Sequence, residues 1–155
     1  MNIFVLDNNP IISAIHHCDK HIVKMPLEVA QMMCALFPKG DAPYKRTHYN
    51  HPCTVWSRQT PANYQWLYNY GVALCKEYTS RYGKQHKSGA VIEWCNDNYT
   101  SDMFEQSNNS LTEFAQAMPD KYKQSSAVNA YRAYYINEKH KIATWKQNKP
   151  IWWAS

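Results

Sequence analysis

The chain has 155 residues, of which 45% are hydrophobic and 14% aromatic. The length is enough for one domain with a core but too short for two. The composition excludes a disordered chain. The formal charge of +5 favours a nucleic acid or nucleotide partner, and five cysteines without a C-x-x-C pair exclude a zinc-finger or dithiol redox motif. No signal peptide and no apolar stretch of membrane-spanning length is present, so we expect one domain over residues 1–155, in the cytoplasm and outside any membrane.

The N-terminal third predicts an extended segment followed by a long helix. The apolar run within Met1 to Asp7 indicates a short extended segment that anchors the N-terminus in the fold. Asn9 followed by Pro10 is typical of an N-cap with proline at the first helical position. We therefore expect a helix from there to about Leu36, kinked at Pro26.

The middle of the chain predicts a loop and a second long helix. Residues 39–59 are rich in cations, imidazoles and aromatic rings, a composition that is atypical of a passive linker. Thr60 and Pro61 predict the start of the next helix, which reaches about Tyr82 and ends at Gly83.

The C-terminal half predicts three further helices. We expect a short helix over about 90–97, one that starts at the capping box of residues 110–113 and ends before Pro119, and one from Ser125 or Ser126 to about Lys146. The aromatic tail is expected to pack back onto the body. Together the patterns predict a mainly α protein, a single compact helical domain with a short extended N-terminal segment.

A polar stripe near the start of the chain is the first candidate site. Its spacings of four, three, four and three residues place five side chains on one helix face: His17, His21, Lys24, Glu28 and Gln31. Apolar residues beside the stripe are expected to form the packing side: Ile22, Val23, Leu27 and Val29. The stripe is typical of a binding or catalytic wall; the alternative is a solvated face with surface ion pairs.

The residue types in the stripe favour amine chemistry over metal chemistry. A carboxylate at Glu28 can hold the Lys24 amine, move its proton or stabilise a cationic intermediate, and an amine can form a Schiff base with a sugar aldehyde; the alternative is a plain surface salt bridge. His17 and His21 have a spacing that lets two imidazoles share one ion. However, no H-E-x-x-H motif is present and Lys20 and Lys24 lie beside the pair, so we expect no metal and no cofactor.

Cations that alternate with aromatic rings form a second set of candidates. The first loop carries Arg46, His48 and His51 among tyrosines, a mixture that suits phosphates and stacked bases. Arg132, inside a tyrosine-rich helix, could hold a phosphate or be a structural arginine stacked between tyrosines.

The segment from Asp19 to Glu28 resembles the first helix of the phage pyrimidine-dimer DNA glycosylases with associated lyase activity. The resemblance implies a catalytic glutamate at Glu28 and a groove-contacting histidine at His21. Further along, the segment that starts at His51-Pro52, the helix containing Tyr64 and Arg81, and the tail of residues 149–153 resemble parts of the same family. The chain also resembles an uncharacterised group of phage-encoded proteins with the H-x-D-K-H and T-H-x-N-H-P segments.

The chain departs from that family at the nucleophile. Members attack the deoxyribose C1′ with the α-amine exposed when the initiator methionine is removed, which requires a small second residue. Asn2 should leave Met1 in place, so the amine belongs to Met1, to Lys24 or Lys20, or the chain lacks this chemistry. The helix-face arginines of the family are replaced by Leu27 and Gln31.

We therefore expect a phage-type DNA glycosylase or abasic-site lyase that binds DNA and acts on a flipped or damaged base. The alternatives are a non-catalytic nucleotide-binding counter-defence protein and a metal-dependent hydrolase. The sequence predicts no oligomeric state. The predicted catalytic residues are Glu28, Lys24 and Met1, and the predicted substrate-binding residues are His17, His21, Lys20, Gln31, Arg46, His48, His51, Tyr64, Arg81 and Arg132.

Overall fold

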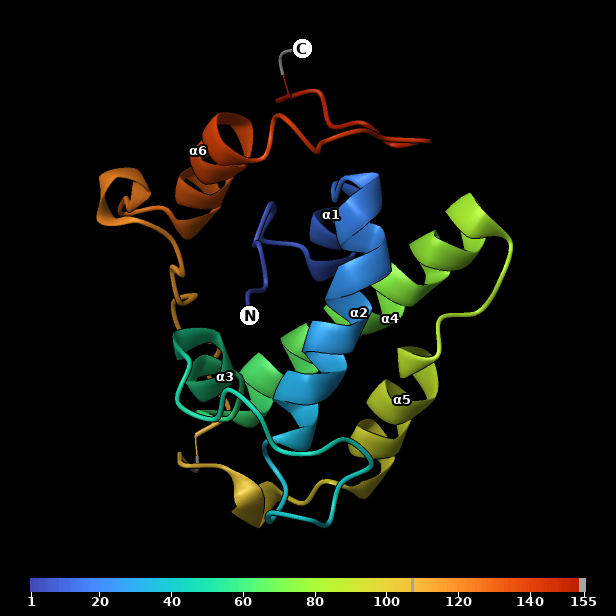
Figure 1. Cartoon of the computed structure of the whole chain (residues 1–155). Helices are drawn as coiled ribbons and strands as arrows, with labels where there is room; N and C mark the ends of the chain where they lie inside the picture. Colours follow the sequence, from blue (N-terminus) through green and yellow to red (C-terminus); the bar gives the residue numbers. More distant parts are fainter. Residues whose placement is uncertain (107, 154–155) are drawn as a thin grey trace.

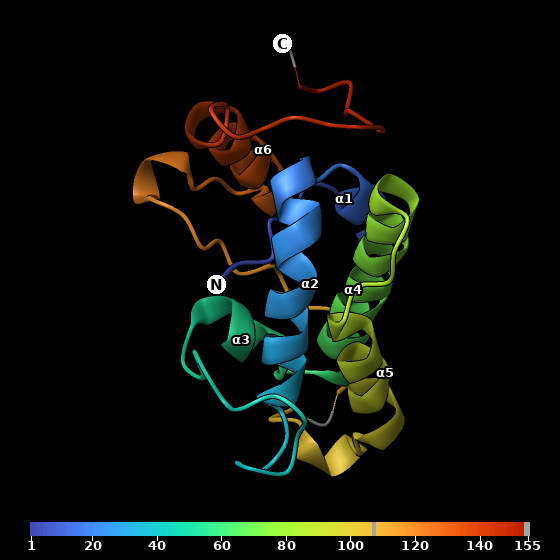
Figure 2. The same ribbon diagram turned by 45° about the vertical axis from the view of Figure 1, so that its right-hand side comes forward.

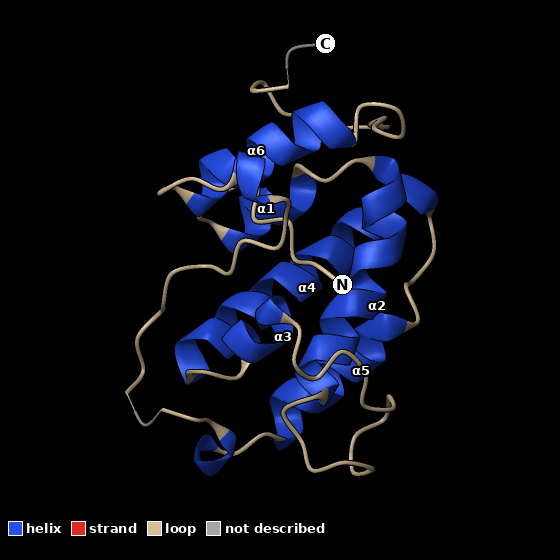
Figure 3. Ribbon diagram, turned by 60° about the vertical axis from the view of Figure 1, so that its left-hand side comes forward, coloured by secondary structure: helices blue, strands red, loops and turns tan. Residues whose placement is uncertain are grey.

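The computed structural model describes residues 1–106 and 108–153, and every regular element in these ranges is helical (Figures 1 and 3). The predicted mainly α fold is confirmed. The α-helices are α1 (Pro10–Ile15), α2 (Asp19–Cys34), α3 (Pro52–Ser57), α4 (Pro61–Tyr82), α5 (Ser88–Asn98) and α6 (Ala127–Glu138), with short 3₁₀ turns η1 (Ser101–Met103) and η2 (Asp120–Tyr122). No helix of the described residues combines the length and apolar character needed to cross a membrane.

Local capping signals set the helix boundaries that were predicted best. The Asn9 side chain accepts hydrogen bonds from the backbone N–H groups of Ile11 and Ile12 at the start of α1. The Thr60 hydroxyl caps α4 by accepting from the Asn63 N–H. Gly83 ends α4 with a φ of 71°, in the left-handed region that favours glycine.

The single helix predicted from Asn9 to Leu36 is wrong, because the chain breaks between α1 and α2. Cys18 is extended (φ −66°, ψ 162°), and its N–H donates to the Tyr135 hydroxyl of α6. Asp19, the first residue of α2, donates its N–H to the Thr144 carbonyl oxygen. Tertiary partners therefore satisfy the backbone groups that a continuous helix would have paired locally. Pro26 lies inside α2.

Two C-terminal predictions are also wrong. Residues 110–118 form no helix, because Thr112 pairs with the Asn63 side chain at the start of α4, through its N–H (2.9 Å) and its hydroxyl (2.8 Å). The Ser110 carbonyl oxygen accepts from the Thr60 hydroxyl. The last helix ends at Glu138 rather than near Lys146, and the chain beyond it runs back along α1 and α2, where Trp145 donates to the His16 carbonyl oxygen.

Helices α2 and α4 pack against each other at the centre, and α5 lies beside them (Figure 2). A side chain at Gly71 of α4 would clash with Val29 of α2, because an added Cβ would lie 2.6 Å from Val29 Cγ1. The N-terminal segment is buried from Asn2 to Leu6, and the N-terminus lies in the middle of the molecule between α2, α3 and α6 (Figures 1 and 2). This placement brings residue 1 to the exposed side of α2.

Candidate active site at the N-terminus

A small pocket of about 220 Å³ lies where the N-terminus meets α2. It is lined by Met1, Lys24, Leu27, Glu28, Gln31 and His48. Three residues of the predicted stripe, Lys24, Glu28 and Gln31, therefore share the pocket with Met1. His48 of the first loop also lines it. The fold brings these groups together from three separate parts of the chain.

Glu28 is an enclosed carboxylate that contacts three nitrogen groups. Its Oε1 lies 3.5 Å from the Met1 amine and accepts the Asn2 N–H at 2.8 Å, and its Oε2 lies 3.6 Å from Lys24 Nζ. The Glu28 side chain is 9% exposed, whereas that of Lys24 is 67% exposed. Nitrogen donors thus fix the carboxylate in one orientation, with Met1 on its sheltered side and Lys24 on its solvent side.

Asn2 fixes the position of the terminal amine, a role that the sequence interpretation missed. Its Nδ2 donates to the Ala117 carbonyl oxygen, and its Oδ1 accepts the N–H groups of Ile3 (2.7 Å) and Phe4 (3.1 Å). Phe4 has a φ of 55°, an unusual value for a residue with a side chain. The first residues are held by their own turn, by the 115–118 segment and by Glu28.

Two histidines of the first loop lie near the amine. His48 borders the pocket, has a φ of 48°, and its Nδ1 lies 2.9 Å from the Thr47 hydroxyl. His51 caps α3, because its Nδ1 accepts the Cys53 N–H. Burial lowers the pKa of His51, and the positive charges of the N-terminal amine and of His48 lower it further. The terminal amine and this loop are therefore close enough for their charges to affect one another.

His17 and His21 do not face the pocket. His17 precedes α2 and is fully buried, with Nδ1 donating to the Ser13 carbonyl oxygen and Nε2 2.7 Å from the Tyr70 hydroxyl. His21 stacks on Phe4, and its Nδ1 lies 2.6 Å from the Tyr135 hydroxyl. The N-terminal segment and α6 cover this end of the helix face, so the predicted stripe is open only from Lys24 to Gln31.

Burial controls the protonation of both imidazoles. Burial lowers the pKa of His17 to about 4 and that of His21 to about 2, and nearby positive charges add smaller effects in the same direction. Both rings are neutral and internal at neutral pH. The structure gives them no route to phosphate, and within residues 1–106 and 108–153 no three metal-ligating side chains come together.

Two residues expected on the packing side are exposed instead. Val23 is 45% exposed and Leu27 is 41% exposed. The prediction that these two side chains form the packing side was therefore wrong, whereas the neighbouring Met25 and Pro26 are buried. Leu27 lines the pocket and gives it an apolar wall.

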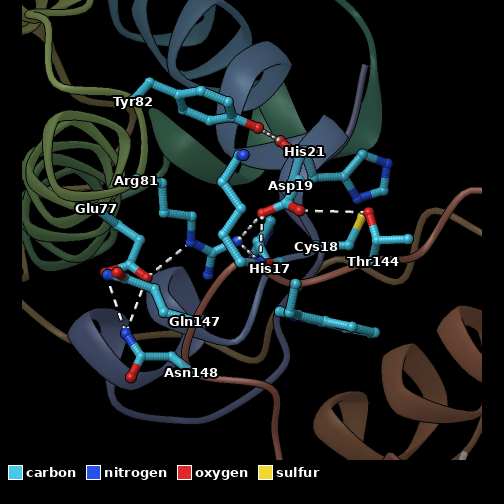
Figure 4. A network of polar contacts seen from close by, with 12 residues as sticks. His17, Cys18, Asp19, His21, Glu77, Arg81, Tyr82, Thr144, Gln147 and Asn148 are labelled. Carbon is cyan, nitrogen blue, oxygen red and sulfur yellow. Dashed lines mark hydrogen bonds and ion pairs between the residues drawn. The ribbon is translucent and has the colours of Figure 1, made fainter.

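Arg81 lies in a buried cluster at the start of α2, and it does not line the pocket (Figure 4). Its guanidinium pairs with Glu77 at 2.9 Å and Asp19 at 3.0 Å, and it donates to the carbonyl oxygens of Ile15 and His17. Asn148 of the C-terminal segment completes the cluster by donating to Glu77. The Nε, Nη1 and Nη2 atoms of Arg81 each donate to an acceptor within the protein.

The remaining predicted binding residues lie apart from the pocket. Tyr64 is buried and donates to the Met33 carbonyl oxygen. Arg132 donates to the Leu6 carbonyl oxygen, pairs with Asp7 and lies over the Trp152 ring. Lys20 is exposed and does not line the pocket. The roles predicted for these residues stay predictions.

A wider groove continues from the pocket toward the first loop. It has a volume of about 540 Å³ and shares Leu27 and Gln31 with the pocket. Arg46 lies in its wall, and the binding role predicted for this residue stays a prediction.

The sequence model of a protein family described as pyrimidine dimer DNA glycosylase matches residues 1–89. No curated protein and no solved structure matches the chain. The matched residues run from the N-terminus through α4 into α5, and they include all six residues that line the pocket.

Proposed function

The chain belongs to the pyrimidine dimer DNA glycosylase family, and from this premise we propose that it removes a flipped or damaged base from DNA by covalent catalysis at the N-terminal pocket. The observation that carries the proposal is the convergence of a primary amine and an enclosed carboxylate: the Met1 nitrogen lies 3.5 Å from Glu28 Oε1 in a small pocket that opens to solvent. An amine nucleophile with an adjacent carboxylate is the arrangement that imine chemistry needs.

The residues divide the reaction between them. Glu28 takes a proton from the terminal ammonium group, and the freed lone pair attacks C1′ of the deoxyribose. The bond from C1′ to the base nitrogen breaks with its electron pair on the base, and Glu28 passes the proton it has taken to the leaving base. Glu28 is then a carboxylate again and stabilises the positive charge that develops on the sugar. The attached nitrogen then gives a second proton to Glu28, the C1′–O4′ bond breaks, and O4′ takes up that proton, which leaves a protonated imine between C1′ and the protein nitrogen. Loss of a C2′ proton from this imine expels the 3′ phosphate, which is the lyase step.

Met1 is the better nucleophile of the two amines near Glu28. An α-amine loses its proton near neutral pH far more readily than a lysine amine does. The Met1 side chain is 1% exposed and its amine faces the carboxylate oxygen that also accepts the Asn2 N–H. Lys24 lies on the solvent side of the same carboxylate, where it can hold a phosphate of the bound strand.

Borohydride trapping tests this function. Wild-type protein, with Met1 first confirmed as its terminal residue by intact mass measurement, is incubated with duplexes that carry an abasic site or a pyrimidine dimer, and borohydride reduces any imine to a stable adduct. We expect an adduct on the N-terminal peptide. Glu28→Gln keeps the shape of the side chain and should slow adduct formation by about 10²-fold or more, the usual contribution of a general acid or base.

Two variants serve as controls. Lys24→Arg retains a positive charge but cannot form an imine, so it should still be trapped, whereas Glu113→Gln alters an exposed carboxylate and should behave as wild type. An adduct that maps to Lys24 would move the nucleophile to that residue. Absence of any adduct with both substrates would refute the covalent proposal.

A further inference from the structure

The groove beside the pocket continues along the same exposed face of α2. Leu27 and Gln31 line both hollows, and the groove extends from them to the loop residues Tyr44, Lys45 and Arg46. Gln31 lies three residues beyond Glu28, so the helical rise places it roughly 4.5 Å further along α2. This distance is comparable with the step of about 3.4 Å between successive nucleotides of one strand.

Arg46 brings a positive charge to the groove that the described residues do not neutralise. Its Nη2 donates to the Phe37 carbonyl oxygen at 2.7 Å, and its guanidinium lies 4.2 Å from the Tyr49 ring. Its Nε is buried and has no acceptor, and no carboxylate of residues 1–106 and 108–153 pairs with Arg46. A buried donor on an uncompensated cation is costly unless a ligand accepts from it. The exposed Lys45 beside it also forms no ion pair within the described residues.

The other wall of the groove offers groups that suit a base. The Gln31 carboxamide makes no hydrogen bond to the described protein atoms, so both its donors and its acceptor are open to a ligand. Leu27 is 41% exposed and presents an apolar surface next to it. The groove thus has a cationic end and an end with an apolar contact and a free amide.

We propose that this groove binds the nucleotide adjacent to the one that reacts, with its phosphate at Arg46 and Lys45 and its base against Leu27 beside Gln31. The proposal rests on the proposed function, because it assigns the groove to the DNA strand whose sugar enters the pocket at Glu28. It makes the first loop a part of the protein that positions the strand, and makes Gln31 a determinant of which neighbouring base is accepted.

The test measures binding of a fluorescent duplex that carries one stable tetrahydrofuran abasic analogue. Lys45→Ala should weaken binding about three- to ten-fold and reduce the slope of log affinity against log salt by about 0.9, as expected for one lost phosphate contact. Lys45 is varied because Arg46 also donates to Phe37, and its loss would disturb the loop. Lys76→Ala, an exposed lysine in the separate cavity between α4 and α5, should leave both quantities unchanged.

A second measurement removes the phosphate charge from the DNA instead of the protein. A neutral methylphosphonate placed directly 5′ or 3′ of the abasic analogue should weaken wild-type binding on one side only. The same substitution should weaken binding of Lys45→Ala less, because only Arg46 still contacts that phosphate. Gln31→Ala should change the preference among the four bases at the same neighbouring position. Equal losses in wild type and Lys45→Ala, or an unchanged base preference in Gln31→Ala, would overturn the groove assignment.

Failure of this inference is distinct from failure of the proposed function. Wild-type protein that is trapped by borohydride, together with a Lys45→Ala variant that has wild-type affinity and salt dependence, would overturn the groove assignment alone. Wild-type protein that neither binds the abasic duplex nor is trapped would overturn both.

Discussion

The Glu28 carboxylate contacts the terminal amine of Met1, the backbone N–H of Asn2 and the side-chain amine of Lys24, and these contacts fix the partner of each oxygen. Oε1 faces Met1 and Asn2, while Oε2 faces Lys24. A carboxylate that is already oriented before substrate arrives needs little reorganisation when charge develops on the sugar. The neighbouring Asn2 turn extends the same rigidity to the amine, since its side chain bonds to Ile3, Phe4 and Ala117.

The two buried histidines predict a stability that falls with acid. The folded pKa of His17 is lowered to about 4 and that of His21 to about 2, so below the ordinary value of about 6.5 the unfolded chain binds protons that the folded chain does not. Each ring should therefore reduce the free energy of unfolding by up to about 1.4 kcal/mol per pH unit as pH falls below 6.5. Urea unfolding at pH 7.5 and pH 5 measures the difference.

Variants separate this effect from other titrations. His17→Gln and His21→Gln should each be less stable at pH 7.5 but should show a smaller loss between the two pH values. The exposed His140 gives a matched control, since His140→Gln should retain the wild-type pH dependence. An identical loss in wild type and in both core variants would contradict the burial argument.

At the scale of elements, the close approach of α2 and α4 positions the site. Helix α2 carries Glu28 in the pocket, and the next residue, Val29, packs against Gly71 of α4. Movement of α2 away from α4 would shift Glu28 relative to the N-terminal segment. The absence of a side chain at Gly71 is therefore a condition for the geometry of the pocket.

Two glycine substitutions should have opposite effects on stability. Gly71→Ala gains helix propensity of about 1 kcal/mol, but its Cβ would lie 2.6 Å from Val29 Cγ1 and 3.2 Å from Ile92 Cδ1. Overpacking of about 1–3 kcal/mol should exceed that gain and destabilise the protein. Gly89→Ala in α5 meets only Cys75 Sγ, at an ordinary 3.6 Å, and should stabilise by up to about 1 kcal/mol. Thermal melts compare the two, and a stabilising Gly71→Ala would contradict the packing argument.

At the scale of the whole molecule, the cluster around Arg81 joins four parts of the chain. Glu77 and Arg81 belong to α4, Asp19 begins α2, and Asn148 comes from the C-terminal segment (Figure 4). The fourth part is the last residue of α1, since the Ile15 carbonyl oxygen accepts from Arg81. Buried ions of this kind depend on one another, because removing one partner leaves an uncompensated charge in the interior.

Arg81→Gln should therefore lower the free energy of unfolding by about 3–5 kcal/mol, because Glu77 and Asp19 would keep their buried charges without the guanidinium. Lys121→Gln breaks an exposed pair with Glu138 and should cost less than about 1 kcal/mol. Urea unfolding checks both values. If Arg81→Gln retained wild-type stability while losing DNA affinity, Arg81 would be a binding residue rather than a structural one.

Short-range signals explain the parts of the fold that the sequence predicted. The caps at Asn9 and Thr60 and the left-handed Gly83 act over a few residues, so they mark helix ends wherever the rest of the chain lies. The capping box at Ser110 failed, because two backbone groups of that segment, the Ser110 carbonyl oxygen and the Thr112 N–H, bond instead to the side chains of Thr60 and Asn63 at the start of α4. Hydrogen bonds between residues about 50 positions apart cannot be predicted from a local sequence pattern.

The sequence by itself determined that Lys24, Glu28 and Gln31 share one face of a helix, because helical spacing alone fixes that relation. Only the tertiary structure decided which part of the face is open: Phe4 and Tyr135 cover His21, while Met1 and His48 complete a pocket around Glu28. The reason is physical. Spacing along a helix sets directions, but burial and the meeting of an amine with a carboxylate depend on which distant segments pack against that face.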